Sequence, residues 1–280
     1  MRIAIFIPAY NAAATIPTVL DRIPDDLKRG VDEIFVVDNA SEDNTHLVAL
    51  GYGHVNSLYT LKVYRNARNL GYGGSQKWAY RYCIDKGYDA VVMLHGDAQY
   101  APEKISYLLD PIIRGEADLV FGSRIAGNPL KGSLDGRGMP RYRYFGNRVL
   151  TTIQNRVLRW DLTEYHSGFR VFRCEALSYV GFEQCSDYYH FDTEILIRFR
   201  MHNMKVVERP IPTYYNKEKF HGNVWVYGFR VLDTMAKYWL SQRGLRRDSR
   251  FALTTAERKP RSVSTAEGID ETPRSVTGNK

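Results

Sequence analysis

A short apolar run that ends abruptly in polar residues constrains the fold of this chain most. Residues 90–94 are apolar, and His95, Asp97 and Gln99 follow them. This order is typical of a buried parallel strand that delivers side chains to the edge of an open sheet, where ligands of α/β proteins bind. The three side chains share one parity, so in an extended segment they can face a single cation that holds a diphosphate. Taken alone, the run also fits an ordinary strand-to-loop transition with one exposed Asp.

Strand-like and helix-like segments alternate over the first 125 residues. We expect strands at residues 3–7, 33–37, 61–64, 90–94 and 118–122. Helices are expected at 15–22, after the capping residues 41–45, at 71–86 and at 102–114. This order predicts an α/β fold with a mainly parallel central sheet flanked by helices.

The later part of the chain is less regular. We expect helices at 147–159, 191–201 and 227–240, and a strand at 205–209. Residues 125–145 are rich in Gly, Pro, Arg and Tyr and lack periodicity, which predicts a functional loop or a mobile lid.

Polar clusters follow four of the predicted strands. They lie at residues 8–11, 38–41, 69–71 and 95–99. In a parallel sheet these positions gather at one edge. Asp38 can accept hydrogen bonds from a nucleobase or a ribose, and the glycines at 71, 73 and 74 allow backbone to approach a ligand closely.

The charge distribution favours anionic small molecules or an anionic membrane surface as partners. The net charge is +8, and residues 243–280 hold half of it, with nine basic and five acidic residues. The rest of the chain is only mildly basic, so we expect no binding to nucleic acid. The three cysteines, Cys83, Cys174 and Cys185, are widely spaced without a zinc pattern, which is typical of reduced thiols in a cytoplasmic protein.

Seven short motifs occur in an order that is more specific than any one of them. Residues 8–11 match Pro-x-Tyr-Asn, 36–45 match Val-Val-Asp-Asp-Gly-Ser-x-Asp-x-Thr, 69–73 match Asn-x-Gly-x-Gly, 95–99 match Asp-x-Asp-x-Gln, 122–124 are Gly-Ser-Arg, 167–170 are Ser-Gly-Phe-Arg, and 191–194 match Phe-Asp-x-Glu. The set, over roughly residues 1–225, resembles family 2 glycosyltransferases with the GT-A fold, in particular the polyprenyl-phosphate (dolichol-phosphate) mannosyl- and glucosyltransferases.

The resemblance implies a metal-dependent, inverting transfer of a sugar from a GDP- or UDP-sugar to an acceptor, with polyprenyl phosphate as the expected acceptor. It implies that the nucleotide is bound by Pro8, Ala9, Tyr10, Asn11, Asp38, Asn69, Gly71, Gly96 and Asp97. It implies Mn²⁺ or Mg²⁺ held by His95, Asp97 and Gln99. It further implies phosphate or acceptor contacts from Arg124, Arg141, Ser167, Arg170, Lys217, Lys219 and His221. Asp97 and Glu164 are the candidate catalytic residues.

Two departures from the family pattern matter for the expected site. Asn39 replaces the second Asp of the base-binding motif, which can alter nucleotide preference. His95 replaces the first Asp of the metal motif. Neutral imidazole is a poorer partner than carboxylate for Mg²⁺ and a better one for Mn²⁺. Alternatively, His95 only hydrogen-bonds the phosphate.

The need for a general base depends on the acceptor. A lipid phosphate is already anionic and needs positioning, whereas a hydroxyl acceptor needs a base. Glu164, four residues before Gly168, is the candidate base or acceptor-orienting group. The alternative for Glu164 is a surface position on a loop.

We predict three regions along the chain. Residues 1–225 form the catalytic domain, 226–253 an amphipathic helix with a basic segment, and 254–280 a disordered tail. No apolar run approaches the roughly 20 residues that span a bilayer, and no signal peptide is evident. We therefore expect a cytoplasmic protein, with its amphipathic helix either packed on the domain or bound peripherally to the inner face of the membrane.

Two other functions are open. One is a glycosyltransferase or sugar-nucleotide-processing enzyme with a soluble acceptor, and the other is a catalytically silent nucleotide-sugar binding protein. A dinucleotide-dependent oxidoreductase fits poorly, because the glycine run follows the third strand rather than the first.

Overall fold

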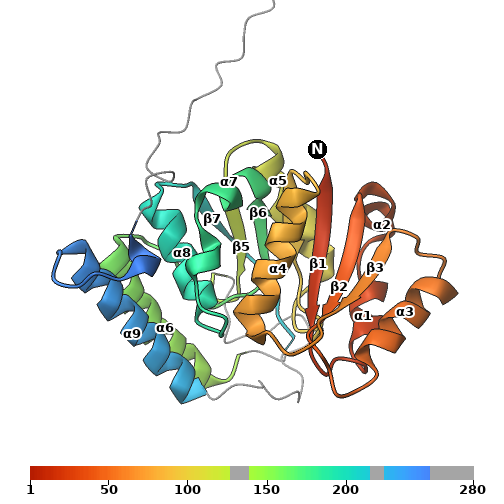
Figure 1. The fold of residues 1–280 in the computed structure, drawn as a ribbon, viewed down its shortest axis with the longest axis horizontal. Helices are drawn as coiled ribbons and strands as arrows, with labels where there is room; N and C mark the ends of the chain where they lie inside the picture. The colour runs from red at the N-terminus through yellow and green to blue at the C-terminus, as the bar shows by residue number, and fades with distance from the viewer. Residues whose placement is uncertain (127–138, 215–223, 253–280) are drawn as a thin grey trace, which may run out of the picture.

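The computed structural model describes residues 1–126, 139–214 and 224–252. Within them, seven strands form one sheet in the order β3-β2-β1-β4-β6-β5-β7 (Figure 1). The strands are β1 (Ile3–Ala9), β2 (Glu33–Asp38), β3 (Leu61–Arg65), β4 (Ala90–Met93), β5 (Leu119–Ser123), β6 (Arg170–Arg173) and β7 (Val206–Pro210). All pairs are parallel except those of β6, which runs antiparallel to β4 and β5. The predicted mainly parallel sheet is confirmed.

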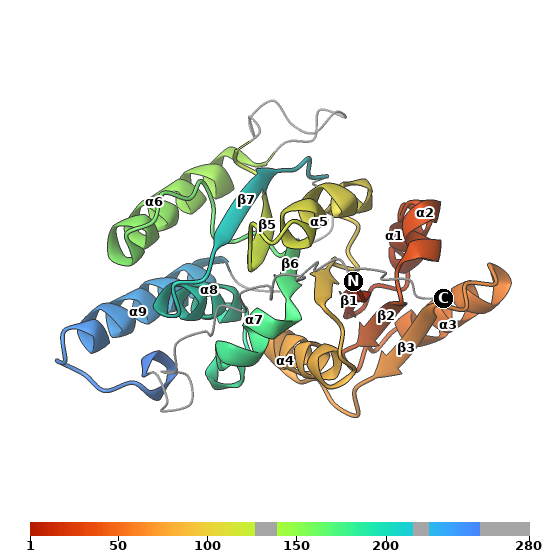
Figure 2. The same ribbon diagram turned by 90° about the horizontal axis from the view of Figure 1, so that it is seen from above.

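Helices cover both faces of the sheet (Figure 2). They are α1 (Ile16–Asp21), α2 (Asp25–Gly30), α3 (Thr45–Val55), α4 (Gly71–Asp85), α5 (Ile105–Ile113), α6 (Arg141–Leu158), α7 (Cys174–Tyr179), α8 (Phe191–Met201) and α9 (Val224–Gln242). Side chains of α4, α7 and α8 pack on one face, around Phe6 and Phe35. Side chains of α1, α3 and α5 pack on the other, around Ile5 and Ile34. Strands buried on both faces explain the continuous apolar runs in the sequence.

The structure adds elements that the pattern did not reveal. Strand β6 has only four residues and an arginine at each end, and α7 follows it directly. Helix α6 begins at Arg141, inside the segment predicted to be irregular, and Pro140 is the residue that precedes it. Residues 127–138 of that segment lie outside the described residues, as does the whole of the predicted tail, 254–280.

The polar clusters meet at one edge of the sheet, as predicted. In the strand register Ala9 pairs with Asp38, and Asp38 pairs with Arg65, so the first three strands end together. The chain order reverses at β1, which lies between β2 and β4. Ligands of open α/β sheets bind at such a switch point.

Helix α9 packs on α6 and α8. Its inward face is made of Val231, Thr234, Met235 and Tyr238. The chain is then anchored where Phe251 is buried against Tyr238 and Arg250 contacts Glu194 of α8. No helix in the described ranges combines the length and the apolar character needed to cross a membrane.

Candidate active site

The loops after β1 and β2 are joined by hydrogen bonds from backbone amides to short side chains. The amide of Asn11 donates to Oγ of Ser41 over 2.9 Å, and the amide of Glu42 donates to Oδ1 of Asn11 over 2.9 Å. Asn11 adopts a left-handed conformation with φ of 50°, which Asn tolerates better than most residues. These bonds place Pro8, Ala9, Tyr10 and Asn11 beside Asp38, as the nucleotide-site prediction requires.

Asp38 has one carboxylate oxygen without a hydrogen bond among the described residues. Its Oδ1 accepts from the amide of Ser41 over 2.9 Å, while Oδ2 lies 3.4 Å from Nε of Arg65 without a hydrogen bond. A buried acceptor with spare capacity is costly unless a ligand or water satisfies it. The geometry therefore suits a donor group on a nucleobase or ribose.

Asn39, the departure from the base-binding motif, faces into the protein. Its amide nitrogen donates to Oδ1 of Asn69 over 2.9 Å, and its oxygen accepts from Asn66 and the amide of Leu70, both over 2.9 Å. Asn69 also accepts from the amide of Gly71. Gly71 has φ of 77°, and a side chain there would overlap the carbonyl oxygen of Asp187. Asn39, Asn69 and Gly71 thus shape the loop that leads into α4.

His95 and Asp97 lie together just beyond β4. Their closest atoms, Nδ1 of His95 and Oδ2 of Asp97, are 3.9 Å apart. Gly96 packs tightly, since a Cβ there would lie 3.1 Å from the carbonyl oxygen of Pro8. The amide of Gln99 donates to Oδ1 of Asp97 over 3.0 Å, which orients the carboxylate.

The donor set fits a divalent cation that is also held by a ligand. In the described part of the chain, no group of three or more His, Cys, Asp or Glu residues is arranged to hold a metal by itself. Two ligands on opposite sides of an ion with bonds of about 2.1 Å are about 4.2 Å apart. The 3.9 Å between His95 and Asp97 lies within that limit, so both can contact one ion whose other positions are left for phosphate oxygens.

Glu164 is fully buried, so the surface position considered for it does not apply. It accepts from the backbone amide of Arg124 and from its Nε, both over 2.8 Å, and also from its Nη2. Nδ2 of Asn147 on α6 donates to the same carboxylate over 2.9 Å. Burial opposes ionisation of Glu164, but the Arg124 guanidinium outweighs it and lowers the pKa of the carboxyl. A carboxylate held in this way orients Arg124 better than it accepts a proton.

Arg170 supports the neighbouring loop from within. It is fully buried and donates to the carbonyl oxygens of Ser167, Tyr165 and Asp192 over 2.9, 3.1 and 3.1 Å. All of these partners are protein atoms, which favours a structural role over direct contact with an acceptor. Ser167 is also fully buried, and its Oγ has no hydrogen-bond partner among the described residues.

Of the other predicted acceptor residues, only Arg141 belongs to the described part of the chain. Arg141 is exposed at the first position of α6. Lys217, Lys219 and His221 lie outside the described residues.

Two residues next to the metal motif were not assigned a role from the sequence. The hydroxyl of Tyr72 lies 3.1 Å from Nε2 of His95 and donates to Oδ2 of Asp192 over 2.9 Å. Burial and the nearby Asp192 carboxylate raise the pKa of Tyr72 well above its usual value, so the hydroxyl stays protonated. Asp192 belongs to the matched Phe-Asp-x-Glu motif, but only the fold brings it to His95.

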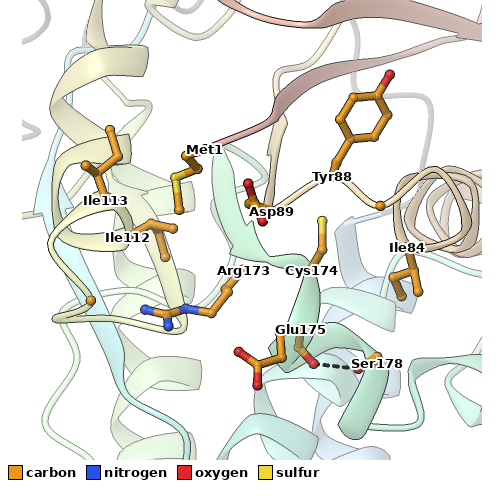
Figure 3. Close-up of a pocket in the computed structure, with 12 residues that line it drawn as sticks. Met1, Ile84, Tyr88, Asp89, Ile112, Ile113, Arg173, Cys174, Glu175 and Ser178 are labelled. Atoms are coloured by element: carbon orange, nitrogen blue, oxygen red, sulfur yellow. Dashed lines mark hydrogen bonds between the residues drawn. The ribbon is translucent and has the colours of Figure 1, made fainter. Parts of the chain in front are cut away.

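A cavity of about 470 Å³ lies away from this site, at the opposite edge of the sheet (Figure 3). Met1, Ile112 and Ile113 line one side of it, and Arg173 and Glu175 lie below them in the view. None of the polar clusters that follow the strands contributes to this cavity. The site at the carboxyl ends of the strands is therefore the better candidate.

Comparison with known proteins identifies the family of this chain. The sequence model of the family described as glycosyl transferase family 2 matches residues 4–181. The UDP-N-acetylglucosamine–dolichyl-phosphate N-acetylglucosaminyltransferase of Methanococcus voltae is 26% identical over 240 residues, which are 82% of this chain and 92% of that protein. The undecaprenyl-phosphate mannosyltransferase of Micrococcus luteus is 28% identical over 220 residues, 78% of this chain and 85% of that one.

Solved structures share the fold. Glucosyl-3-phosphoglycerate synthase from Mycobacterium tuberculosis, in complex with phosphoglyceric acid, superimposes with a TM-score of 0.63. The match covers 89% of this chain and 81% of that chain at 21% identity. Another structure of that enzyme contains Mn²⁺, UDP and glucosyl-3-phosphoglycerate, with a TM-score of 0.60 and 19% identity over the same shares. The predicted GT-A fold is confirmed.

Proposed function

The chain belongs to glycosyl transferase family 2, and from this premise we propose that it moves a hexose from a GDP- or UDP-sugar to polyprenyl phosphate. The proposed reaction needs a divalent cation and inverts the anomeric carbon. One observation carries the proposal: Asp38, the His95–Asp97 pair and the Glu164–Arg124 pair all lie at the carboxyl edge of the sheet. The relatives named for dolichyl and undecaprenyl phosphate match most of this chain.

In this proposal each group has a distinct task. Asp38 accepts hydrogen bonds from the nucleoside, and the loops around Asn11 and Asn69 hold it in place. Mn²⁺ or Mg²⁺ bound by His95 and Asp97 would offset the charge that develops on the diphosphate leaving group. An oxygen of the acceptor phosphate attacks the anomeric carbon while the bond to the nucleoside diphosphate breaks. Arg124 is oriented by Glu164 to bind phosphate.

The state of Glu164 favours a phosphate acceptor over a hydroxyl acceptor. A hydroxyl needs a base, whereas a phosphate is already anionic near neutral pH. Glu164 is buried, bound by Arg124 and Asn147, and has a lowered pKa. It is therefore a weak base.

Two experiments test the proposal. In a thermal-shift titration, one of UDP-glucose, UDP-N-acetylglucosamine or GDP-mannose should raise the melting temperature only with Mn²⁺, and Asp97→Ala should abolish the shift. A transfer assay should then show product with a short-chain polyprenyl phosphate and none with the matching polyprenol. Transfer to the alcohol alone would contradict the phosphate acceptor, and no shift with any donor would contradict the donor site.

We also propose that α6 and α9 form a surface that binds anionic lipid. The two helices lie side by side (Figure 1). Tyr142 and Phe145 of α6, and Trp225 and Phe229 of α9, are each more than 60% exposed. Exposed aromatic side chains near basic residues such as Arg148 suit the interface of an anionic bilayer.

The same helix contacts the acceptor loop. The Tyr227 hydroxyl of α9 lies 2.7 Å from Nδ1 of His166, two residues from Glu164. A membrane bound by this surface would place lipid phosphate near that loop. In a flotation assay with phosphatidylglycerol vesicles, Trp225→Ser with Phe229→Ser should reduce binding. The control Val55→Ser with Tyr59→Ser removes exposed apolar residues at and just after the end of α3 and should not reduce binding. Equal binding by both variants would contradict this surface.

A further inference from the structure

His95 is the first of three side chains linked in a row. Its Nε2 lies 3.1 Å from the hydroxyl of Tyr72, and that hydroxyl donates to Oδ2 of Asp192 over 2.9 Å. Oδ1 of Asp192 lies 3.5 Å from Nη1 of the fully buried Arg170. An aspartate in such an ion pair is a carboxylate, and a carboxylate only accepts hydrogen bonds.

The hydrogen-bond order assigns the tautomer of His95. Tyr72 has one hydroxyl proton, and it points to Asp192. The Tyr72 oxygen can then bond with His95 only as an acceptor, so Nε2 of His95 must carry a hydrogen. A neutral imidazole carries only one, and Nδ1 is left with its lone pair.

Nδ1 is also the nitrogen nearest to Asp97. Its distance of 3.9 Å from Oδ2 is too long for a hydrogen bond and short enough for two ligands of one ion. A lone pair at this position is what a metal requires of histidine.

The ring is held by packing as well. Tyr72 and Tyr100 contact the imidazole edge to face, with ring centroids 5.6 and 5.3 Å away. A Cβ at Gly168 would overlap Nε2 of His95, so only glycine fits there. The amide of Gly168 is itself fixed by the Tyr100 hydroxyl over 2.8 Å.

We propose that Tyr72 and Asp192 are positioning residues that present Nδ1 of His95 to the cation. The cation site formed by the His95 imidazole and the Asp97 carboxylate then selects Mn²⁺ over Mg²⁺. The inference deepens the proposed function and rests on its cation site. A hydrogen-bonded partner on the other nitrogen is the usual way to orient a metal-binding histidine, and its loss typically weakens metal binding 10- to 100-fold. Imidazole suits transition metals better than Mg²⁺, which prefers oxygen.

The first test reads the tautomer in the metal-free protein. Long-range ¹H–¹⁵N spectra of protein labelled on histidine should show His95 with an unprotonated Nδ1 and a protonated Nε2. The His95→Gln spectrum identifies the signal among the seven histidines. A protonated Nδ1 in the wild type would overturn the proposal.

The second test measures metal binding directly. Titration of the full chain with Mn²⁺ in the presence of UDP or GDP, followed by electron paramagnetic resonance, should show ¹⁴N coupling from an imidazole. Tyr72→Phe should weaken Mn²⁺ binding roughly 10-fold or more. The matched control is Tyr88→Phe, because the Tyr88 hydroxyl also donates to a carboxylate, Glu33, over 3.1 Å without contacting His95. Equal Mn²⁺ affinity in the two variants would overturn the proposal.

The two proposals fail in different ways. If the protein binds Mn²⁺ through His95 but transfers no sugar, the assigned tautomer stands and the proposed function falls. If it transfers sugar with Mg²⁺ and Mn²⁺ equally and shows no ¹⁴N coupling, the proposed function stands and the role of Tyr72 and Asp192 falls.

Discussion

The two halves of the candidate site are built by different means. On the donor side, the loops after β1, β2 and β3, polar contacts join backbone amides to short side chains such as Ser41 and Asn39. On the acceptor side, formed by residues 123–126, 147, 164–168 and α9, a buried charge pair is central. Glu164 and Arg124 come from segments 40 residues apart, and the carboxylate of Glu164 is fully buried while the Arg124 side chain is largely so.

The two halves should differ in how much stability a single substitution removes. Hydrogen bonds between neutral groups contribute about 1 kcal/mol each, so the donor side distributes its stability over many contacts. A buried charge depends on its one partner, because a lone charge in the interior is very unfavourable. We therefore expect the acceptor side to lose stability abruptly and the donor side to lose it gradually.

The largest effect on stability is expected for Arg124→Met. It leaves the Glu164 carboxylate buried without its cation and should lower the free energy of unfolding by about 3–5 kcal/mol. Urea denaturation measures the change. The matched control is Lys77→Met on α4, the helix that follows the donor-side loop after β3. It removes an ion pair of 2.8 Å with Asp187, whose side chain is 60% exposed, and should cost less than about 1 kcal/mol. Similar losses in the two variants would remove the distinction between the halves.

A smaller but function-specific effect is expected for Asp97→Asn. The Asp97 side chain is 38% exposed, so the free energy of unfolding should change by less than about 0.5 kcal/mol. Sugar transfer should fall about 10²- to 10³-fold, because charge stabilisation of the leaving diphosphate is lost. Single-turnover rates and urea denaturation of the same preparation separate the two. A large loss of stability with little loss of rate would place Asp97 in the framework instead.

The donor side was largely predictable from the sequence, and the acceptor side was not. Residues 8–11, 38–41 and 95–99 follow strands with clear apolar runs, and parallel pairing alone brings strand ends together. Nothing local distinguishes buried Glu164 from a surface residue, since its burial depends on Arg124 and on Asn147 of α6. Strand β6 was missed for the same reason, because it has an arginine at each end. Arg170 can be buried only because it donates to a backbone carbonyl oxygen and pairs with Asp192, and the local sequence does not show these partners.

Asn39 offers a finer test of the donor side. Asn39→Asp replaces an amide donor by an acceptor that faces Oδ1 of Asn69 and the carbonyl oxygen of Gly71. We expect a loss of about 1–3 kcal/mol in the free energy of unfolding, measured with urea. Asn69→Asp is the control, because its Oδ1 already acts only as an acceptor and should be retained. If Asn39→Asp instead changes the preferred base at unchanged stability, Asn39 contacts the nucleotide.

The smallest expected effect is a pH dependence on the acceptor side. Burial lowers the pKa of His166 to about 4 from its usual 6.5, and burial does the same to His190. Above pH 6.5, both histidines are neutral in the folded protein and in the unfolded chain. As the pH falls from 6.5 towards 4, these histidines bind protons in the unfolded chain but not in the folded protein. The free energy of unfolding therefore declines across that window.

His166→Gln should remove its share of this decline, about 1 kcal/mol between pH 7 and pH 5, because the residue as a whole is only partly buried. The measurement is the urea midpoint as a function of pH for the wild type and the variant. The variant keeps His190, so part of the decline in stability with falling pH should remain. His54→Gln is the control, because His54 lies at the end of α3, on the donor half of the sheet. An unchanged slope in His166→Gln would mean that the acceptor loop admits water and solvates the charged ring. Water would then also reach the Glu164–Arg124 pair more easily than its geometry indicates. The expected loss of unfolding free energy in Arg124→Met would be smaller for the same reason.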